Sequence, residues 1–138
     1  MGHIYVDVTV RGLAARRRGK TFRCLVDTGA TDTLLPADAL KGLGIKPHST
    51  REYEMGDGRI VPFPVAHAIL QFEGEELAAD VLAGPAGIGP VLGVTALEST
   101  GFVVDPRSER LRKVRGIPLK RVRTLAGVGW AVPPSTDE

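Results

Sequence analysis

The fold of this chain is decided by the stretch FRCLVDTGAT, residues 22–31, in which a strand-like run leads directly into Asp27, Thr28 and Gly29. An ionised carboxylate at the end of an apolar strand is costly unless it accepts hydrogen bonds. Gly29 lets the backbone turn closely, so that backbone amides and Thr28 can support Asp27. Asp-Thr-Gly by itself is also typical of an ordinary strand-ending turn. The motif therefore has to be weighed with the rest of the chain.

Two features around this turn favour a functional role over a purely structural one. Apolar residues precede Asp27, and Ala30 and Thr31 follow it. Far downstream, a second apolar run ends in glycine, Val91-Leu92-Gly93, just before a predicted short helix. The similarity of the two runs predicts that they form two paired halves of one site.

Periodicity and turn residues predict a β protein. Seventeen Gly and ten Pro break the chain often, which favours short strands over long helices. Asp57 and the glycines on either side of it predict a hairpin turn between two extended runs. We expect strands over residues 4–10, 21–26, 50–55, 59–63, 65–72, 77–82, 102–105 and 111–114, and short helices over residues 34–44 and 94–100.

Length and composition fit one domain without a stabilising metal or disulfide. The chain has 138 residues, and its only cysteine, Cys24, cannot form an intrachain bridge. No cluster of Cys and His shows zinc-ligand spacing, so we expect no metal and no cofactor. The N-terminus lacks the pattern of a signal peptide and no stretch is long enough to cross a bilayer, which predicts a cytoplasmic protein that does not enter a membrane.

The positive charge of the chain lies near its C-terminus. Residues 1–105 hold ten Lys or Arg against thirteen Asp or Glu, whereas residues 107–123 hold eight basic residues and one acidic residue. We interpret this run as a solvated strand and tail, with a nucleic-acid contact as the alternative, and expect no nucleic-acid partner. Residues 1–115 are predicted to form the domain, and residues 116–138 a partly disordered C-terminal extension. The extension could be a propeptide-like segment that is removed, or it could add a strand that completes an interface.

Residues 25–31 and 91–96 resemble the two signature segments of retropepsin-like aspartic proteases, and the predicted hairpin at residues 56–58 lies where that family carries its flap. The resemblance spans roughly residues 4–114. It implies an all-β, single-domain acid protease fold, closed like a barrel, with one or two short helices. It also implies a homodimer, and Asp27-Thr28-Gly29 occurs only once in the chain. Two copies of Asp27 would share one proton and activate the water that attacks a peptide bond, with activity favouring mildly acidic pH.

The resemblance implies a role for each matching position. Asp27 would be catalytic, Thr28 would brace the active-site turns across the dimer, and Gly29 and Ala30 would bind substrate backbone. The remaining predicted site residues are Thr31 and Asp32 beside the turn, Met55, Gly56, Asp57 and Gly58 in the flap, and Val91, Leu92 and Gly93 in the second segment. Leu25, Ile88 and Val91 would line an apolar cleft for peptide or protein substrates. The alternative function is an inactive dimeric module that binds peptides without cutting them.

Two positions depart from the retroviral pattern. Thr31 stands where an acidic residue usually follows the Ala, and Val94 stands where an Arg usually follows the downstream Gly, so the ion pair between these positions is expected to be absent. The other candidate residues receive structural interpretations: His3, His48 and His67 at the surface or in the core, Cys24 as a buried packing residue, and Asp7, Asp32 and Asp80 as structural or solvated. Of these three carboxylates, Asp32 is the most favoured to contact the cleft.

Overall fold

The computed structural model describes residues 3–15 and 19–115. This part of the chain contains nine strands and two short helices. They are β1 (Tyr5–Arg11), β2 (Gly19–Asp27), β3 (Thr33–Pro36), α1 (Ala37–Gly42), β4 (Ser49–Glu54), β5 (Ile60–Phe72), β6 (Glu75–Gly84), β7 (Val91–Gly93), α2 (Val94–Thr100), β8 (Phe102–Asp105) and β9 (Arg110–Lys113). The predicted extension, residues 116–138, lies outside the described residues.

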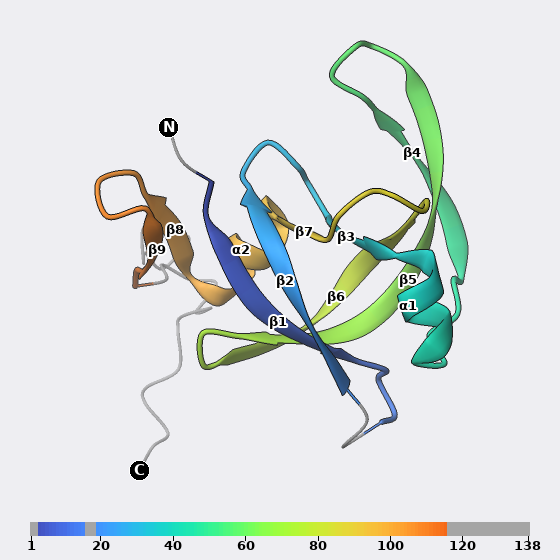
Figure 1. Cartoon of the computed structure of the whole chain (residues 1–138), viewed down its shortest axis with the longest axis horizontal. Helices are drawn as coiled ribbons and strands as arrows, with labels where there is room; N and C mark the ends of the chain where they lie inside the picture. Colours follow the sequence, from blue (N-terminus) through green and yellow to red (C-terminus); the bar gives the residue numbers. More distant parts are fainter. Residues whose placement is uncertain (1–2, 16–18, 116–138) are drawn as a thin grey trace, which may run out of the picture.

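Six of the strands close into a barrel (Figure 1). Their order is β1-β2-β7-β3-β6-β5, and β5 pairs back onto β1 over residues 9–11 and 69–71. β4 extends from β5 as a hairpin that projects beyond the barrel, and β8 and β9 form a separate two-stranded sheet. The prediction of an all-β, closed fold with two short helices is confirmed.

Most of the predicted strands are present, and β5 is longer than expected. The sequence suggested separate strands over residues 59–63 and 65–72, but Ile60–Phe72 is one strand despite Pro62 and Pro64. The carbonyl groups of Arg59 and Val65 accept backbone bonds from the β4 side, at 2.8 Å each. The prolines lie between these positions, with their nitrogens turned away from β4, and β6 pairs with β5 only from Val65 onward. Neither proline therefore removes a bond from the sheet.

The predicted helix over residues 34–44 is partly wrong. Leu34 and Leu35 belong to β3, which pairs in parallel with β6, and only Ala37–Gly42 is helical. Leu35 is fully buried in the core. The sheet offers this leucine-rich run both hydrogen bonds and burial, and that outweighs its local tendency to join the helix that begins after Pro36. The helix at Val94–Thr100 ends at Gly101, as predicted, with a φ of 82°.

The core fills the inside of the barrel. Inward positions alternate along β1 and β2, where Val6, Val8 and Val10 face Phe22 and Cys24. Burial raises the pKa of the Cys24 thiol to about 12, with a smaller contribution from Asp7, so this thiol is a packing residue, as predicted. A second apolar cluster, centred on Phe63, Val65 and Leu82, lies under the β4–β5 hairpin.

One crossing of the chain dictates the shape of the site. β7 lies between β2 and β3, although β2 and β3 are consecutive in sequence, so residues 28–32 must pass across the end of β7. Gly93 lies directly beneath this loop: a Cβ atom there would be 2.5 Å from the backbone carbon of Asp32. The N–H of Gly93 donates to the Thr33 hydroxyl at 3.1 Å in a buried bond. Only glycine fits between the loop and the strand.

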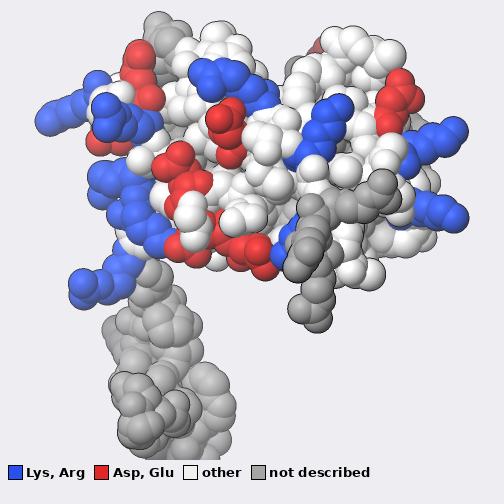
Figure 2. Space-filling view, turned by 60° about the horizontal axis from the view of Figure 1, so that its bottom comes forward, with Lys and Arg blue, Asp and Glu red and all other residues white. Residues whose placement is uncertain are grey.

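Charges of both signs share the surface. On the face shown in Figure 2, Lys and Arg gather most densely at the left edge, beside a row of acidic side chains. In β9, Lys113 pairs with Glu75 and also donates to the Thr100 carbonyl at 2.8 Å. Within residues 3–15 and 19–115, no helix combines the length and the apolar character that spanning a membrane requires.

Replacing Gly93 tests the crossing. Gly93→Ala places a methyl group against the Asp32 backbone, and we expect the free energy of unfolding to fall by about 1–3 kcal/mol or more. Urea unfolding measures this. Gly42→Ala is the matched control, because nothing lies within 4 Å of its added Cβ and it ends α1; it should leave stability unchanged or raise it by up to about 1 kcal/mol. Equal stability of both variants would contradict the packing described.

Candidate active site

Asp27 is the last residue of β2, and its side chain is exposed. The turn after it is held locally: the Gly29 N–H donates to Asp27 Oδ1 at 2.9 Å, and the Ala30 N–H donates to the Asp27 carbonyl at 3.1 Å. A Cβ at Gly29 would lie 3.2 Å from the same carboxylate oxygen. One carboxylate oxygen is therefore fixed by the backbone, while Oδ2 has no hydrogen-bond partner among the described residues.

The second signature segment holds the turn from behind. β2 and β7 pair in parallel, with Asp27 opposite Gly93. The first two N–H groups of α2 have no partner inside the helix, and they donate to the loop instead: Val94 to the Ala30 carbonyl at 2.8 Å and Thr95 to the Thr31 carbonyl at 3.1 Å. The two segments predicted to be paired halves are thus joined by backbone bonds, and the joining needs no ion pair between Thr31 and Val94.

A cavity of about 310 Å³ opens beside Asp27. The active-site turn forms one wall, from Gly29 to Asp32, and the β4–β5 hairpin forms another through Tyr53, Met55 and Gly56. The floor is apolar and consists of Leu34, Phe63, Leu82 and Val91. Ile88 lines an adjoining cavity that shares Met55 and Phe63 with the first, whereas Leu25 lines neither. An extended peptide could place apolar side chains in both cavities.

The predicted flap residues form the tip of the β4–β5 hairpin. Met55 and Arg59 close the hairpin with a backbone bond of 2.8 Å, and Gly58 takes a φ of 87°. Asp57 accepts from the backbone N–H of Arg59 at 3.1 Å and from its guanidinium at 2.7 Å. These bonds, the backbone bond first, lower the pKa of the Asp57 carboxyl. The tip is closed by its own hydrogen bonds, and Met55 at its base packs against the apolar cluster of Phe63, Val65 and Leu82.

Asp32 also lines the cavity, as does the exposed Glu54, and unlike Asp27 it is paired with other side chains among the described residues. The Tyr53 hydroxyl donates to Asp32 Oδ2 at 2.5 Å, and Arg51 Nη1 lies 3.7 Å from the same oxygen. Its side chain is only 12% exposed. Burial, and then the bond to Asp32, raise the pKa of Tyr53. Asp32 therefore anchors the hairpin to the turn, and Asp27 keeps its free oxygen.

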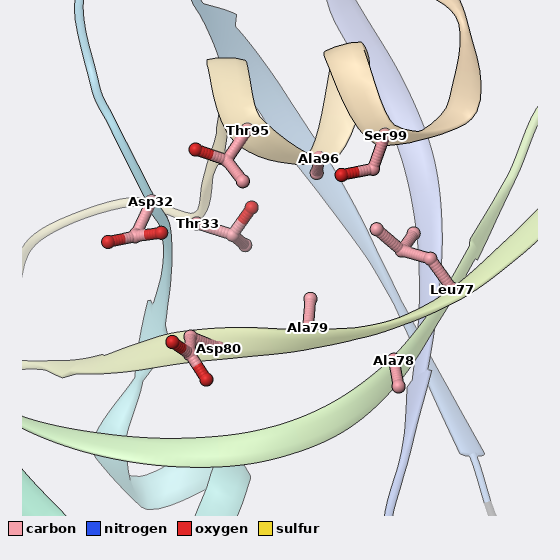
Figure 3. A pocket seen from close by; sticks show the side chains of 9 residues that line it. All are labelled: Asp32, Thr33, Leu77, Ala78, Ala79, Asp80, Thr95, Ala96 and Ser99. Atoms are coloured by element: carbon pink, nitrogen blue, oxygen red, sulfur yellow. The ribbon is translucent and has the colours of Figure 1, made fainter. Parts of the chain in front are cut away.

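A second cavity, of about 230 Å³, lies on the other side of Asp32 (Figure 3). Thr95 and Ser99 of α2 face Asp80 of β6 across it, and Thr33 and Ala79 line its inner wall. Asp27 does not line this cavity. Asp32 lies between the two cavities and lines both.

The structure brings most predicted site residues together. Asp27, Gly29, Ala30, Thr31 and Asp32 line one cavity with Met55, Gly56 and Val91. Leu92 and Gly93 are buried beneath the turn, and Thr28, Asp57 and Gly58 are exposed outside that cavity. Sequence reasoning missed Arg51 and Tyr53. Their spacing could have predicted this position, because residues 51, 53 and 55 share one face of a strand and Met55 was already assigned to the flap.

Comparisons with known proteins agree with this geometry. Residues 13–99 match the family model described as "gag-polyprotein putative aspartyl protease". The solution structure of simian foamy virus (mac) protease is similar in fold, with 20% identity, a TM-score of 0.50, and coverage of 68% of this chain and 91% of that one. The crystal structure of a retropepsin-like aspartic protease from Rickettsia conorii has 25% identity and a TM-score of 0.57, covering 76% of this chain and 78% of that one. No curated protein sequence matches the chain.

The Tyr53–Asp32 contact can be tested by alkaline titration. The chain has two tyrosines, so in Tyr5→Phe all tyrosinate absorbance comes from Tyr53. We expect its midpoint above the ordinary value of about 10, and we expect Asp32→Asn to lower that midpoint without returning it fully, because burial is the larger cause. Asp38→Asn, an exposed carboxylate on α1, is the control. Since the raised pKa favours the neutral ring, the free energy of unfolding falls as pH rises through this range. A midpoint equally insensitive to both substitutions would contradict the contact.

Proposed function

This chain belongs to the retropepsin-like aspartic protease family, and we propose that it is an aspartic endopeptidase that acts as a homodimer. In the proposed dimer, two copies of Asp27 hold the water that hydrolyses a peptide bond. The substrate is an extended peptide or protein segment, bound between the active-site turns and the two β4–β5 hairpins.

The observation that carries the proposal is the state of Asp27. Its carboxylate is exposed at the end of β2, with Oδ1 held by the Gly29 N–H and a cavity of about 310 Å³ at its side. The neighbouring carboxylate, Asp32, already has Tyr53 and Arg51 as partners. A general acid and base pair needs a second free carboxylate, and a second copy of the chain supplies one.

The chemistry follows from two equivalent carboxylates that share one proton. Two like charges a few ångströms apart cannot both ionise easily. The ionised Asp27 takes a proton from water as the water oxygen attacks the carbonyl carbon, while the protonated Asp27 donates to the carbonyl oxygen. Their roles then reverse, and the leaving amine is protonated as the C–N bond breaks. Activity is expected at mildly acidic pH.

The surface around Asp27 supports pairing with a second copy. A cavity of about 180 Å³ on the outer side of the turn joins Asp27 and Thr28 to the N-terminal residues His3 and Ile4 and to the β8–β9 turn at Pro106. In Figure 1 these segments lie toward one end of the barrel, at the upper left. Thr28 is exposed there. We propose that this face is the dimer interface, with Thr28 bonded across it.

Peptide cleavage tests the catalytic role of Asp27. Wild type should cut members of a mixed peptide library at roughly pH 4 to 7. Asp27→Asn keeps the size of the side chain and removes its charge, and we expect the rate to fall by at least about 10²–10⁴-fold. Mass spectrometry identifies the products and the residues that flank each cut. Asp38→Asn, an exposed carboxylate on α1, should retain full activity.

Each outcome of this experiment decides between functions. Equal cleavage by wild type and Asp27→Asn would exclude the aspartic mechanism. No cleavage by either, in a sample that sediments as a dimer, would favour the alternative of an inactive dimeric peptide-binding module. In that case, peptide binding measured on the same sample should persist.

Sedimentation tests the proposed interface. Two symmetry-related hydrogen bonds from Thr28 would contribute about 1–3 kcal/mol, so Thr28→Ala should raise the dimer dissociation constant by roughly 5- to 150-fold. Thr50→Ala, at an exposed position of β4, is the matched control and should leave the constant unchanged. A dimer that is equally strong in both variants would place Thr28 outside the interface.

A further inference from the structure

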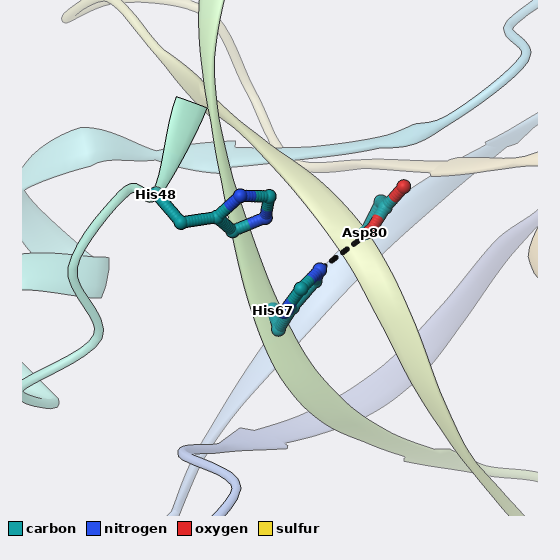
Figure 4. Close-up of side chains that lie close together, drawn as sticks. All are labelled: His48, His67 and Asp80. Atoms are coloured by element: carbon teal, nitrogen blue, oxygen red, sulfur yellow. Dashed lines mark ion pairs between the residues drawn. The ribbon is translucent and has the colours of Figure 1, made fainter. Parts of the chain in front are cut away.

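Three side chains that are far apart in sequence meet on the outer surface of the sheet: His48, His67 and Asp80 (Figure 4). Each offers a ligand atom, and these atoms all lie within 4.8 Å of one another. His67 and Asp80 are directly opposite across β5 and β6, with His67 Nε2 3.1 Å from Asp80 Oδ1. The His48 ring lies beside the His67 ring, with 3.9 Å between centroids.

From these contacts we propose that His48, His67 and Asp80 form a binding site for a divalent transition-metal ion, with Zn²⁺ as the best match. Two imidazoles and one carboxylate are a ligand set that Zn²⁺ accepts, with water in the fourth position. The proposal does not rest on the protease function. From sequence, His3, His48 and His67 were assigned surface or core roles, because they follow no metal-ligand spacing along the chain.

The backbone fixes this grouping. His67 and Asp80 lie within paired strands, and the N–H of His48, just before β4, donates to the Val65 carbonyl at 2.8 Å. Two paired strands, β5 and β6, and the residue just before β4 therefore present one ligand each on the same outer surface. Directly opposite residues in antiparallel strands hold their Cβ atoms about 4.5–5.5 Å apart, which suits side chains that share an ion.

The distances fit after a small movement of one side chain. Tetrahedral zinc with bonds of about 2.0–2.1 Å spaces its ligand atoms about 3.4 Å apart. His67 Nε2 and Asp80 Oδ1, at 3.1 Å, are already near this spacing. His48 is exposed, so its ring can rotate to close the remaining gap without disturbing the core. The exposed surface also leaves room for bound water.

The positive charge of Arg51 would repel a cation bound here, but the position of its guanidinium weakens that repulsion. Its Nη1 lies 3.1 Å from Asp80 Oδ2, the oxygen that does not face His67. Asp80 thus offers one oxygen to the ion while the other is held by an outer partner, an arrangement that orients ligating carboxylates. The Arg51 side chain is 45% exposed, and its guanidinium also approaches Asp32, so its charge is divided between two carboxylates.

An ion pair between His67 and Asp80 explains only part of the cluster. It needs a protonated imidazole, and it gives no role to His48, whose ring lies against His67. A metal ion bound by both imidazoles and the carboxylate gives all three side chains a role.

Calorimetric titration of the full chain with Zn²⁺ alone, at neutral pH, tests the site. We expect one ion bound per chain in wild type. The double variant His48→Gln/His67→Gln should bind at least about 10-fold more weakly, since loss of even an outer partner of a metal ligand costs 10- to 100-fold. His3→Gln replaces the third histidine of the chain and should match wild type. All three proteins should fold, because the substituted side chains are exposed.

Urea unfolding gives a second readout that needs no activity. An ion that binds only the folded chain stabilises it, so Zn²⁺ should raise the unfolding midpoint of wild type and His3→Gln but not that of the double variant. Asp80→Asn should reduce the shift. Equal Zn²⁺ binding by wild type and the double variant, or no binding by wild type, would overturn the proposal. Neither result would bear on peptide cleavage.

Discussion

The structure depends on the passage of residues 28–32 across the end of β7. This crossing places the Asp27 turn on top of Gly93, and it is possible only because Gly93 has no side chain. The loop is then held from below by the Gly93 N–H, which donates to the Thr33 hydroxyl, and by the first N–H groups of α2. These groups would otherwise lack partners at a strand end and a helix start. The crossing over Gly93 therefore gives the first N–H groups of α2 their acceptors and positions the Asp27 turn. It also lets β7 fill the place in the barrel between β2 and β3.

The two carboxylates at this turn differ because their surroundings differ. Asp32 is nearly buried, accepts from Tyr53 and approaches Arg51, so its charge is balanced inside the chain. Asp27 is exposed, and among the described residues only the Gly29 N–H bonds to its carboxylate. The first carboxylate fastens the β4–β5 hairpin to the turn. The second keeps a free oxygen toward the cavity, which is what proton transfer to and from a bound water requires.

Arg51 links this cavity to the outer surface of the sheet. Its guanidinium lies 3.7 Å from Asp32 and 3.1 Å from Asp80, and it is 3.4 Å from the Tyr53 hydroxyl. Beyond Asp80 the contacts continue to His67 and His48. The hydrogen bonds of Arg51 to Tyr53 and to Asp80 raise the pKa of Arg51, and the Tyr53 bond is the larger cause. Polar groups on β4, β5 and β6 thus form one continuous row from the active-site turn to the histidine cluster.

The sequence by itself determined the family resemblance, the strand-rich fold, the Asp27 turn, the hairpin at residues 56–58 and the helix that Gly101 ends. These are local features, set by alternation, turn residues and short motifs whose physical basis lies within a few positions. Only the tertiary structure decided that Leu34 and Leu35 form a strand and that Pro62 and Pro64 lie inside one. It alone joined Tyr53 to Asp32 and gathered His48, His67 and Asp80. Which side chains face one another depends on strand register between distant segments, and local pattern does not contain that register.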